Sequence, residues 1–526
     1  SNIDSGDIII PENTTDNQIL PVETNPIQVE NLNDSTDIPV ITSTDTTDIQ
    51  TDNNLPQSTL QEISENINFL TLSAPTNNNQ TTNVDTVQEQ TEASINHTTD
   101  TQQILKTINP VNTKYLITAT ASDQVVTMLE RNSIQEYSDY LGANLEGKLI
   151  STQSVRDILS DMAKKTGKES AIVYINVYPE QLQIILYTKE GQPIIKTIPI
   201  VNREQIMKVA LELRIRVTSP SYQDNDSYLL PAQQLYNWLI APIASELEAA
   251  NIDTLLFSMD EGLRTLAIAA LHDGEQFLIE KYSLSLIPSV SLMDTNYRTL
   301  ENTRVLAMGA SEFIAHNSLP GVPIELEIVS QELWQGSMFL NKDFTLNNLI
   351  AQRESYPYPI IHLATHADFR PGKISNSYIQ LWGEEQIKLD QIRELGWNES
   401  SVELLVLSAC RTAFGDKNAE LGFAGLAIAA GVKSALASIW YVNDRATLAL
   451  MTEFYSHLNQ TKIKAEAVRQ AQLAMLRGDV MIRGNQIARV GGLESVQLPS
   501  VLGEIKNRKL SHPYHWAGFT MVGSPW

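Results

Sequence analysis

Two residues of this 526-residue chain have types and positions that suit nucleophilic chemistry. Cys410, the only cysteine in the sequence, ends the apolar run 402–410, and His366 ends another apolar run, 359–366. A nearby imidazole makes a thiolate available and can later protonate a leaving amine. A cysteine and a histidine at the ends of neighbouring strands are therefore the minimal equipment for acyl transfer. The alternative is that Cys410 is a small buried hydrophobe, the commoner role of a lone cysteine in such a run.

Such a dyad also needs N–H donors for the oxyanion that develops during acyl transfer. We expect residues 367–369 to form a turn, so that the backbone N–H groups of Ala367 and Cys410 are the candidate donors. His362 and His366 have the H-x-x-x-H spacing that holds zinc on a helix. Along a strand the same spacing spans about 13 Å, which is too far for one ion, so His362 is expected to be structural.

The elements that must position these residues form an alternating pattern. Strand-like runs lie at 170–178, 181–188, 253–260, 303–310, 359–369, 402–410 and 433–442, and helical patterns lie at 230–252, 325–336, 421–432 and 445–460. This alternation predicts an α/β fold with a mainly parallel sheet covered by helices on both faces. Functional residues of such sheets gather just beyond the carboxyl ends of the strands, where Cys410 and His366 are expected.

The first fifth of the chain differs in composition from the rest. Residues 1–105 contain 17 acidic residues and no Lys or Arg, so they carry most of the formal net charge of −25. Their Thr-, Asn- and Asp-rich composition predicts an acidic, largely disordered tail. Residues 106–165 have helical patterns that end at glycines, and we expect them to form a helical linker.

Composition also argues against several classes of function. The sequence contains no Lys/Arg cluster of the kind that binds nucleic acid. It also contains no apolar run as long as the ~18 residues that a membrane helix needs. No EF-hand loop, Walker loop or G-x-G-x-x-G motif is present, so no cofactor is expected. A single cysteine excludes an internal disulfide and favours a cytoplasmic location. A secretion signal that has been removed is the alternative.

Four segments together resemble a known family. They are 255–289, 360–369, 406–447 and 512–523, and they occur in the order that the family shows. They are similar to the CHAT family of caspase-like cysteine peptidases of clan CD, which are related to separase and the caspases. The resemblance covers about residues 165–526.

The resemblance implies both an architecture and a set of catalytic roles. The architecture is a caspase-like α/β/α sandwich in which a silent caspase-like half, residues 166–300, precedes an active half, residues 301–526. Cys410 would be the nucleophile that forms a thioester acyl-enzyme, and His366 would be the general acid and base. The family usually has glycine directly after this histidine, and Ala367 is a departure from that pattern.

The resemblance also suggests a specificity. Segment 439–447 is similar to the separase-like segment in which an acidic residue receives a basic P1 side chain, and here that residue is Asp444. A carboxylate can form a charge-assisted, bidentate contact with arginine. The alternative is that Asp444 caps the helix that follows it. Asp416 and Glu420 are weaker candidates for the same pocket.

The sequence thus predicts a cysteine endopeptidase that cleaves protein or peptide substrates after Arg or Lys, with a regulatory protein as a further partner. The alternative is a catalytically latent or inactive caspase-like scaffold that binds a partner protein. A basic P1 preference would exclude self-cleavage within 1–105, which holds no basic residue. The first candidate sites for self-cleavage are Lys106, Lys114 and Arg131.

Overall fold

A computed structural model describes residues 122–147, 150–398, 402–503 and 505–526 of the chain. These ranges belong to one compact unit. The predictions for the acidic tail and for residues 106–121 lie outside them. Every helix in the described ranges is too short or too polar to cross a membrane.

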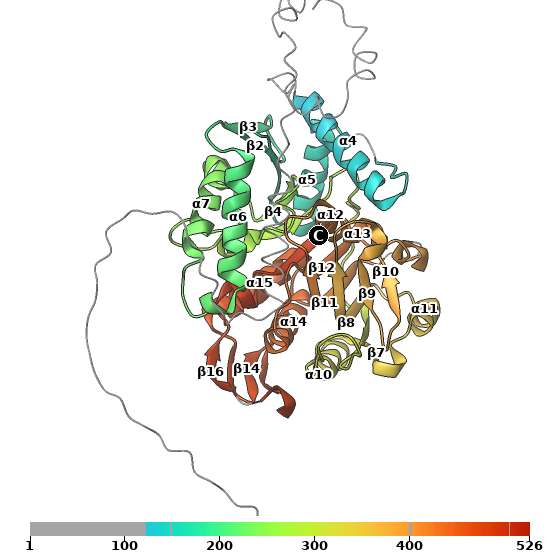
Figure 1. Ribbon diagram of the computed structural model, residues 1–526. Helices are drawn as coiled ribbons and strands as arrows, with labels where there is room; N and C mark the ends of the chain where they lie inside the picture. Colours follow the sequence, from blue (N-terminus) through green and yellow to red (C-terminus); the bar gives the residue numbers. More distant parts are fainter. Residues whose placement is uncertain (1–121, 148–149, 399–401, 504) are drawn as a thin grey trace, which may run out of the picture. The chain divides into compact units, whose positions relative to one another are not determined.

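The elements of the first part of the described chain follow the predicted alternation, and Figure 1 labels most of them. They are α4 (Ser122–Leu141), α5 (Thr152–Thr166), β1 (Ser170–Val177), β2 (Leu182–Tyr187), β3 (Ile194–Ile198), α6 (Arg203–Thr218), α7 (Leu229–Leu239), α8 (Ala244–Ala249), β4 (Thr254–Met259), α9 (Leu278–Lys281) and β5 (Ser283–Leu286). As predicted, α4 and α5 stop at glycines with positive φ, Gly142 and Gly167.

The second part of the chain continues the same rhythm. Its elements are β6 (Arg304–Gly309), α10 (Val322–Glu327), β7 (Gln335–Leu340), α11 (Leu346–Ser355), β8 (Ile360–Phe369), β9 (Tyr378–Gln380), β10 (Gln386–Lys388), β11 (Leu404–Thr412), α12 (Lys417–Ala424), α13 (Leu426–Ala430), β12 (Ser434–Ser438), α14 (Asp444–Leu458), α15 (Lys464–Arg477), β13 (Met481–Gly484), β14 (Gln486–Val490), β15 (Leu493–Gln497), β16 (Ile505–Lys509) and β17 (Phe519–Gly523). Strands β13 to β16 form a separate four-stranded sheet.

The remaining strands form one 13-stranded sheet with the order β10-β9-β8-β11-β12-β17-β5-β4-β1-β2-β3. In addition, β6 pairs with β8, and β7 pairs with β6. Strands β7, β6, β8, β11 and β12 are parallel to their neighbours in that order, and so are β17, β5, β4 and β1. The pairs in β10-β9-β8 and in β1-β2-β3 are antiparallel, as is the central pair of β12 with β17. Helices flank this sheet, so the predicted α/β architecture with a mainly parallel sheet is confirmed.

The C-terminal strand connects the two groups of strands. β17 pairs with β12 on one side and with β5 on the other. Strands β1 to β5 therefore share one sheet with strands β6 to β12. The division of the chain into a silent half and an active half at residue 300 stays a prediction.

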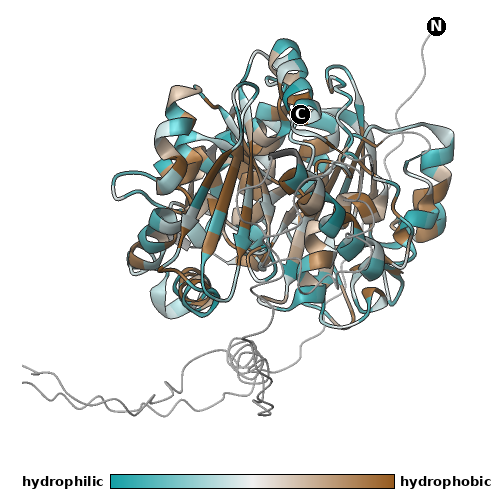
Figure 2. Cartoon of the chain, turned by 90° about the horizontal axis from the view of Figure 1, so that it is seen from above, coloured by the Kyte–Doolittle hydropathy of each residue, from teal (hydrophilic) through white to brown (hydrophobic). Residues whose placement is uncertain are grey.

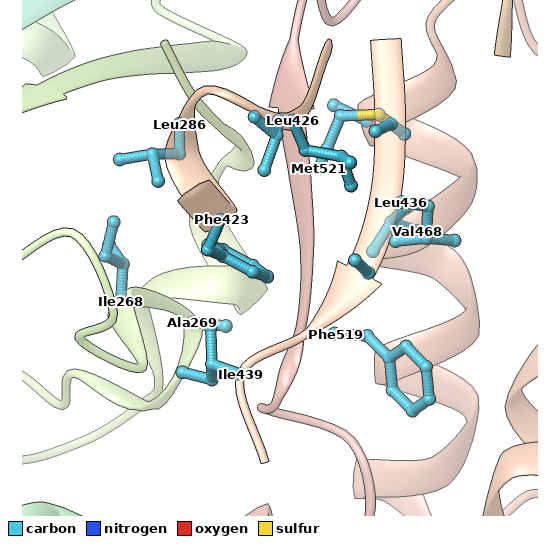
Figure 3. Packing of buried hydrophobic residues seen from close by; sticks show 14 of the residues in the cluster. Ile268, Ala269, Leu286, Phe423, Leu426, Leu436, Ile439, Val468, Phe519 and Met521 are labelled. Carbon is cyan, nitrogen blue, oxygen red and sulfur yellow. The ribbon is translucent and has the colours of Figure 1, made fainter. Parts of the chain in front are cut away.

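Hydrophobic side chains from both groups of strands form a common core beside β17. Leu286 of β5, Leu436 of β12 and Met521 of β17 pack in the same region (Figure 3). The strands are hydrophobic along much of their length (Figure 2), and β1, β4, β8 and β12 are buried at every position. Burial on both faces is the usual condition of central parallel strands, and it explains why these runs do not alternate in polarity.

Three local predictions were wrong. Residues 367–369, which the strand-like run 359–369 also included, belong to β8 rather than to a turn, because Ala367 pairs in register with both β11 and β9. Gly336 does not stop a helix but lies in β7, paired with Val305 of β6. The predicted helix 421–432 is divided at Gly425, where a Cβ atom would lie 2.7 Å from the carbonyl oxygen of Leu421.

Helix α4 is fastened to the sheet by a fully buried carboxylate. Glu130 accepts hydrogen bonds from the Tyr174 hydroxyl at 2.6 Å and the Ser289 hydroxyl at 2.7 Å. It also accepts from the backbone N–H groups of Val290 and Ser291. A buried carboxylate is tolerated only when its lone pairs are used in this way.

The variant Glu130→Gln should therefore lower the free energy of unfolding by about 2–4 kcal/mol, because its amide nitrogen would face donors that need an acceptor. Urea unfolding followed by circular dichroism would measure this loss. The exposed Glu146 provides a control, and Glu146→Gln should change the free energy by less than about 0.5 kcal/mol. Equal small effects for the two variants would mean that Glu130 does not fasten α4.

Candidate active site

His366 and Cys410 lie on neighbouring parallel strands, β8 and β11. His366 is in register with Ala409, and Cys410 is in register with Ala367. Adjacent strands are about 4.8 Å apart and a residue rises about 3.3 Å, so a one-residue offset separates the two Cα atoms by about 6 Å. The predicted neighbourhood of the two strands is thus present in the structure.

A change of partner strand leaves His366 beside a loop. β6 pairs with β8 only as far as Gly309, opposite Ala364, and β9 pairs with β8 from Ala367 onward. The register between β8 and β11 also shifts in this interval. A Cβ atom at Gly309 would lie 2.5 Å from the Ala364 carbonyl oxygen, so glycine is required where the chain leaves the sheet. Residues 310–321, here called the cover loop, begin at this point.

A groove with a volume of about 1070 Å³ opens beside His366. Its walls include residues of the cover loop, of β8 and β11, and of the segment after β12. The lining residues are Thr218, Pro220, Gln223, Ile314, Ala315, His316, Asn317, His366, Asp368, Phe369, Arg370, Pro371, Ala409, Arg411, Thr412, Ala413, Trp440, Tyr441 and Tyr514. This set includes the residues on either side of Cys410 but not Cys410 itself.

The cover loop holds the imidazole of His366. The His366 Nε2–H group donates to the carbonyl oxygen of Asn317 at 2.8 Å. The ring of His316 stacks on that of His366 with centroids 4.9 Å apart, and Phe313 meets it edge-on at 4.7 Å. Burial lowers the pKa of His366, although the hydrogen bond to Asn317 opposes this shift. The imidazole is therefore neutral at pH 7 and engaged with the loop.

Cys410 is fully buried behind the wall of the groove. Its thiol is completely inaccessible to solvent, and Sγ donates to the Leu407 carbonyl oxygen at 3.4 Å. Burial raises the pKa of the Cys410 thiol well above its ordinary value. In the described part of the chain no hydrogen bond joins this thiol to His366. The structure thus brings the two residues together on adjacent strands without forming a thiol–imidazole contact.

Ala367 occupies an ordinary strand position. It is not among the described residues with positive φ, so alanine in place of the family's usual glycine imposes no backbone strain here. In the sheet Ala367 is paired with Cys410 of β11 on one side and with Ile379 of β9 on the other. Use of its N–H group as an oxyanion donor would therefore require this end of the ladder to rearrange.

Asp444 does not line the groove, but it contacts the cover loop. It is the first residue of α14, whereas the residue that caps this helix is Asn443, so the alternative that Asp444 is the cap is wrong. Asp444 Oδ2 accepts a hydrogen bond from the backbone N–H of Gly321. Burial raises the pKa of Asp444 to about 6, although that hydrogen bond opposes the shift.

The weaker candidate Asp416 is also away from the groove. Its carboxylate caps α12 and accepts a hydrogen bond from the Ala419 N–H at 2.8 Å. The next residue, Lys417, forms an ion pair with Glu136 of α4 at 3.1 Å. The segment that follows β11 is therefore fastened to α4.

Glu420, the other weaker candidate, is fully buried in α12. Its oxygens accept from the Gly262 N–H at 2.7 Å and from the Thr265 hydroxyl at 3.3 Å. Burial raises its pKa to about 7, although the charge of Arg264 opposes this shift. Glu420 thus links α12 to the turn after β4, and it does not line the groove.

His362 has the structural position that its spacing suggested. It is fully buried, with Nε2 2.8 Å from Glu325 Oε1 and Nδ1 3.1 Å from the Tyr455 hydroxyl. These contacts join β8 to α10 and α14. No group of three His, Cys, Asp or Glu side chains in the described ranges is placed to hold a metal ion.

Sequence reasoning missed an ionic cluster on the wall of the groove. Asp368, Arg370 and Arg411 all line the groove and are joined by ion pairs. Burial acts to raise the pKa of Asp368, but the hydrogen bonds and charges of the two arginines outweigh this effect and lower it. The available signal was position, since Asp368 is two residues after His366 and Arg411 directly follows Cys410.

Alkylation of the single cysteine would test the burial of the thiol. In the folded chain at pH 7, iodoacetamide should label Cys410 at least roughly 100-fold more slowly than a free thiol, because access requires local opening and the thiolate is disfavoured. Mass spectrometry would follow the labelling, with the urea-unfolded chain as a control that should react completely. Labelling of the folded chain at the rate of a free thiol would contradict the described position of Cys410.

We compared the chain with known sequences and structures to identify its family. No curated protein sequence matches the chain. Among solved structures, separase in its complex with securin from Saccharomyces cerevisiae has a TM-score of 0.42 at 9% sequence identity, and the match covers 76% of this chain and 34% of that one. The chain thus spans about a third of the length of the separase chain.

Two further structures have lower scores. RgpB of Porphyromonas gingivalis, in a complex of its pro- and mature domains, has a TM-score of 0.33 at 10% identity and covers 76% of this chain and 75% of that one. The Arg-specific cysteine proteinase gingipain R has a TM-score of 0.33 at 11% identity and covers 56% and 67%. The family profile described as CHAT domain matches residues 229–524, which include β4, β8, β11 and β17. The chain therefore belongs to the CHAT domain family.

Proposed function

We propose that the protein is a cysteine endopeptidase in which Cys410 is the nucleophile and His366 is the general acid and base. The observation that carries this proposal is the pairing of β8 with β11, which sets the two residues one position apart, with His366 in the lining of a large groove and Cys410 buried behind its wall. Membership of the CHAT domain family, as well as the presence of both residues in the matched range, supports it.

In the proposed reaction His366 accepts the thiol proton, and Cys410 Sγ attacks the carbonyl carbon of the scissile peptide. The C–N bond then breaks, His366 gives the proton to the leaving amine, and a thioester joins the acyl group to Cys410. Water, deprotonated by His366, hydrolyses this thioester and restores the thiol. The N–H groups of Ala367 and Cys410 are the proposed donors to the oxyanion.

This chemistry requires a conformation other than the resting one described above. The thiol must enter the groove, and the imidazole must exchange Asn317 for the thiol as its partner. The cover loop holds His366 through Asn317 and holds Asp444 through Gly321. We propose that substrate binding displaces this loop and so releases the His366 imidazole and the Asp444 carboxylate in one movement.

The proposed specificity is for Arg or Lys at P1, with Asp444 as the residue that receives the basic side chain. Asp444 lies three residues after Tyr441, which lines the groove and stacks on His366 at 6.0 Å. Loss of the Gly321 hydrogen bond would leave a partly buried carboxylate without its donor, and a guanidinium group would supply replacements.

The second candidate function is a catalytically latent scaffold that binds a partner protein. The complete burial of Cys410 favours this alternative. The groove beside His366 would then be a docking site rather than a place of reaction. The two candidates differ in whether a ligand of the groove makes Cys410 reactive.

A peptidyl acyloxymethylketone with Arg at P1 distinguishes them. An endopeptidase should be labelled at Cys410 by this probe at a far higher rate than by iodoacetamide, because the peptide part opens the site. The matched probe with Asp at P1 should label weakly, and His366→Ala should lose the labelling. Mass spectrometry with Cys410→Ala as the blank measures the adduct. Equal, slow labelling by both probes would favour the scaffold.

The pH dependence of cleavage tests Asp444. Its pKa of about 6 means that the carboxylate is charged at pH 7 and is neutralised as the pH falls through about 6. For an Arg-P1 peptide, kcat/KM should therefore decrease below pH 6 by up to about tenfold per pH unit. Asp444→Asn should reduce kcat/KM at pH 7 and should leave only the decrease that protonation of the general base His366 causes at low pH. An unchanged decrease in Asp444→Asn would assign the whole step to a group other than Asp444.

A further inference from the structure

Strand β11 is bent directly before Cys410. The Cys410 thiol contacts the carbonyl oxygen of Leu407, three residues earlier, at 3.4 Å. Three residues of an extended strand span about 10 Å, which is farther than a cysteine side chain reaches, so the backbone between Leu407 and Cys410 is not fully extended. The register between β8 and β11 shifts at the same place, between Leu407 and Ala409. This bend therefore accompanies the buried position of the thiol.

The pairing of β11 with its other neighbour, β12, ends before the bend. Among the described residues the last paired position is Val406 with Leu436, although β12 continues to Ser438. A buried backbone carbonyl needs a hydrogen-bond donor. The carbonyl of Cys410 receives one from a side chain, because the Ser438 hydroxyl donates to it at 2.9 Å. A side chain thus takes the role of the backbone ladder at Cys410.

Ser438 is the firmly held partner in this hydrogen bond. It is fully buried and pairs with Phe519 of β17. The next residue, Ile439, donates its N–H to the Gly518 carbonyl at 2.9 Å, and its own carbonyl accepts from Arg214 Nη2 at 2.8 Å. The end of β12 is therefore fixed from two directions, and the bent segment of β11 is the part that can change conformation.

The cover loop does not account for the position of the thiol. The hydrogen bonds of the cover loop described above hold the His366 imidazole and the Asp444 carboxylate. Cys410 is held by Ser438 of β12 instead. Displacement of the cover loop would therefore release the imidazole while the bond at Cys410 remains. Entry of the thiol into the groove requires a second release.

We propose that Ser438 is a positioning residue, whose hydrogen bond to the Cys410 carbonyl holds β11 in the bent conformation that keeps the thiol behind the groove wall. When this bond breaks, residues 408–410 move and the thiol enters the groove. The inference rests on the proposed peptidase function only for the role of the released thiol as nucleophile. Trp440 and Tyr441 follow Ser438 by two and three residues and line the groove, so a bound peptide would contact the chain close to this bond.

The Ser438→Ala variant of the full-length chain tests this role without any need for turnover. The Cys410 carbonyl would then lack its donor in the bent conformation, whereas water supplies a donor when the segment opens. Iodoacetamide should therefore label Cys410 at pH 7 about tenfold faster in Ser438→Ala than in the wild-type chain. Mass spectrometry of samples taken over time would give the two rates.

The matched control is Ser434→Ala. Ser434 lies in the same strand, is also fully buried, and its hydroxyl also donates to a backbone carbonyl, that of Ser524. This variant removes a comparable hydrogen bond at the other end of β12. The labelling rate of Cys410 should therefore stay within about twofold of the wild-type rate. Urea unfolding of both variants would measure the loss of global stability that they share.

The urea dependence of labelling separates a local release from general destabilisation. Labelling through local opening is nearly independent of urea below the unfolding transition, whereas labelling through global unfolding increases steeply from zero urea. The wild-type chain and Ser438→Ala should both show the nearly constant rate, at levels about tenfold apart.

Two results would overturn the role of Ser438. Equal labelling rates in Ser438→Ala and Ser434→Ala would reduce Ser438 to a general packing contact. A steep urea dependence in the wild-type chain would show that only unfolding releases the thiol, and this result does not require that Ser438→Ala folds. Failure of the peptidase is a separate result. The Arg-P1 acyloxymethylketone would then label neither chain faster than iodoacetamide does, while the difference between the two serine variants persists.

Discussion

The parallel pairing of β8 with β11 is the constraint on which the candidate site depends. Its register sets His366 beside Ala409 and Asp368 beside Arg411, and it therefore determines which side chains share the groove. A shift of one residue would exchange the members of these rows. Both strands are central and almost entirely buried, so hydrophobic contacts fix the register far more strongly than the polar groups of the site do.

The elements around this pair act mainly as supports. His362 joins β8 to α10 and α14, and α10 directly follows Gly321, the residue that contacts Asp444. On the other side of the site, Glu420 and Lys417 connect α12 to the turn after β4 and to α4. Residues that are acidic and close to Cys410 in sequence thus serve the packing of helices, because their carboxylates find backbone and basic partners within the fold.

The sequence allowed seven strands of the large sheet, several helices and the placement of Cys410 and His366 on neighbouring strands to be predicted, because long apolar runs and glycine stops are local signals. Strand β7, part of which was predicted to be helical, and the sheet of β13 to β16 were not predicted. Helix α6 was missed although its capping box, Asn202 with Gln205, was a readable signal. The side of the sheet on which Cys410 lies could not be predicted, since it depends on the register shift between β8 and β11. The contact of Asn317 with His366 is equally non-local, because it joins residues 49 positions apart.

The burial of the single cysteine also bears on oxidation. Peroxides attack the thiolate rather than the thiol, and susceptibility increases with exposure. Cys410 in the resting conformation offers neither, because it is inaccessible and its pKa is raised. The burial that separates the thiol from the imidazole therefore also protects the sulfur from oxidation in the conformation described here. In the proposed reaction, an irreversible sulfinic or sulfonic product would form mainly after the groove has opened, so the conformation proposed for catalysis is also the one in which the thiol is open to oxidation.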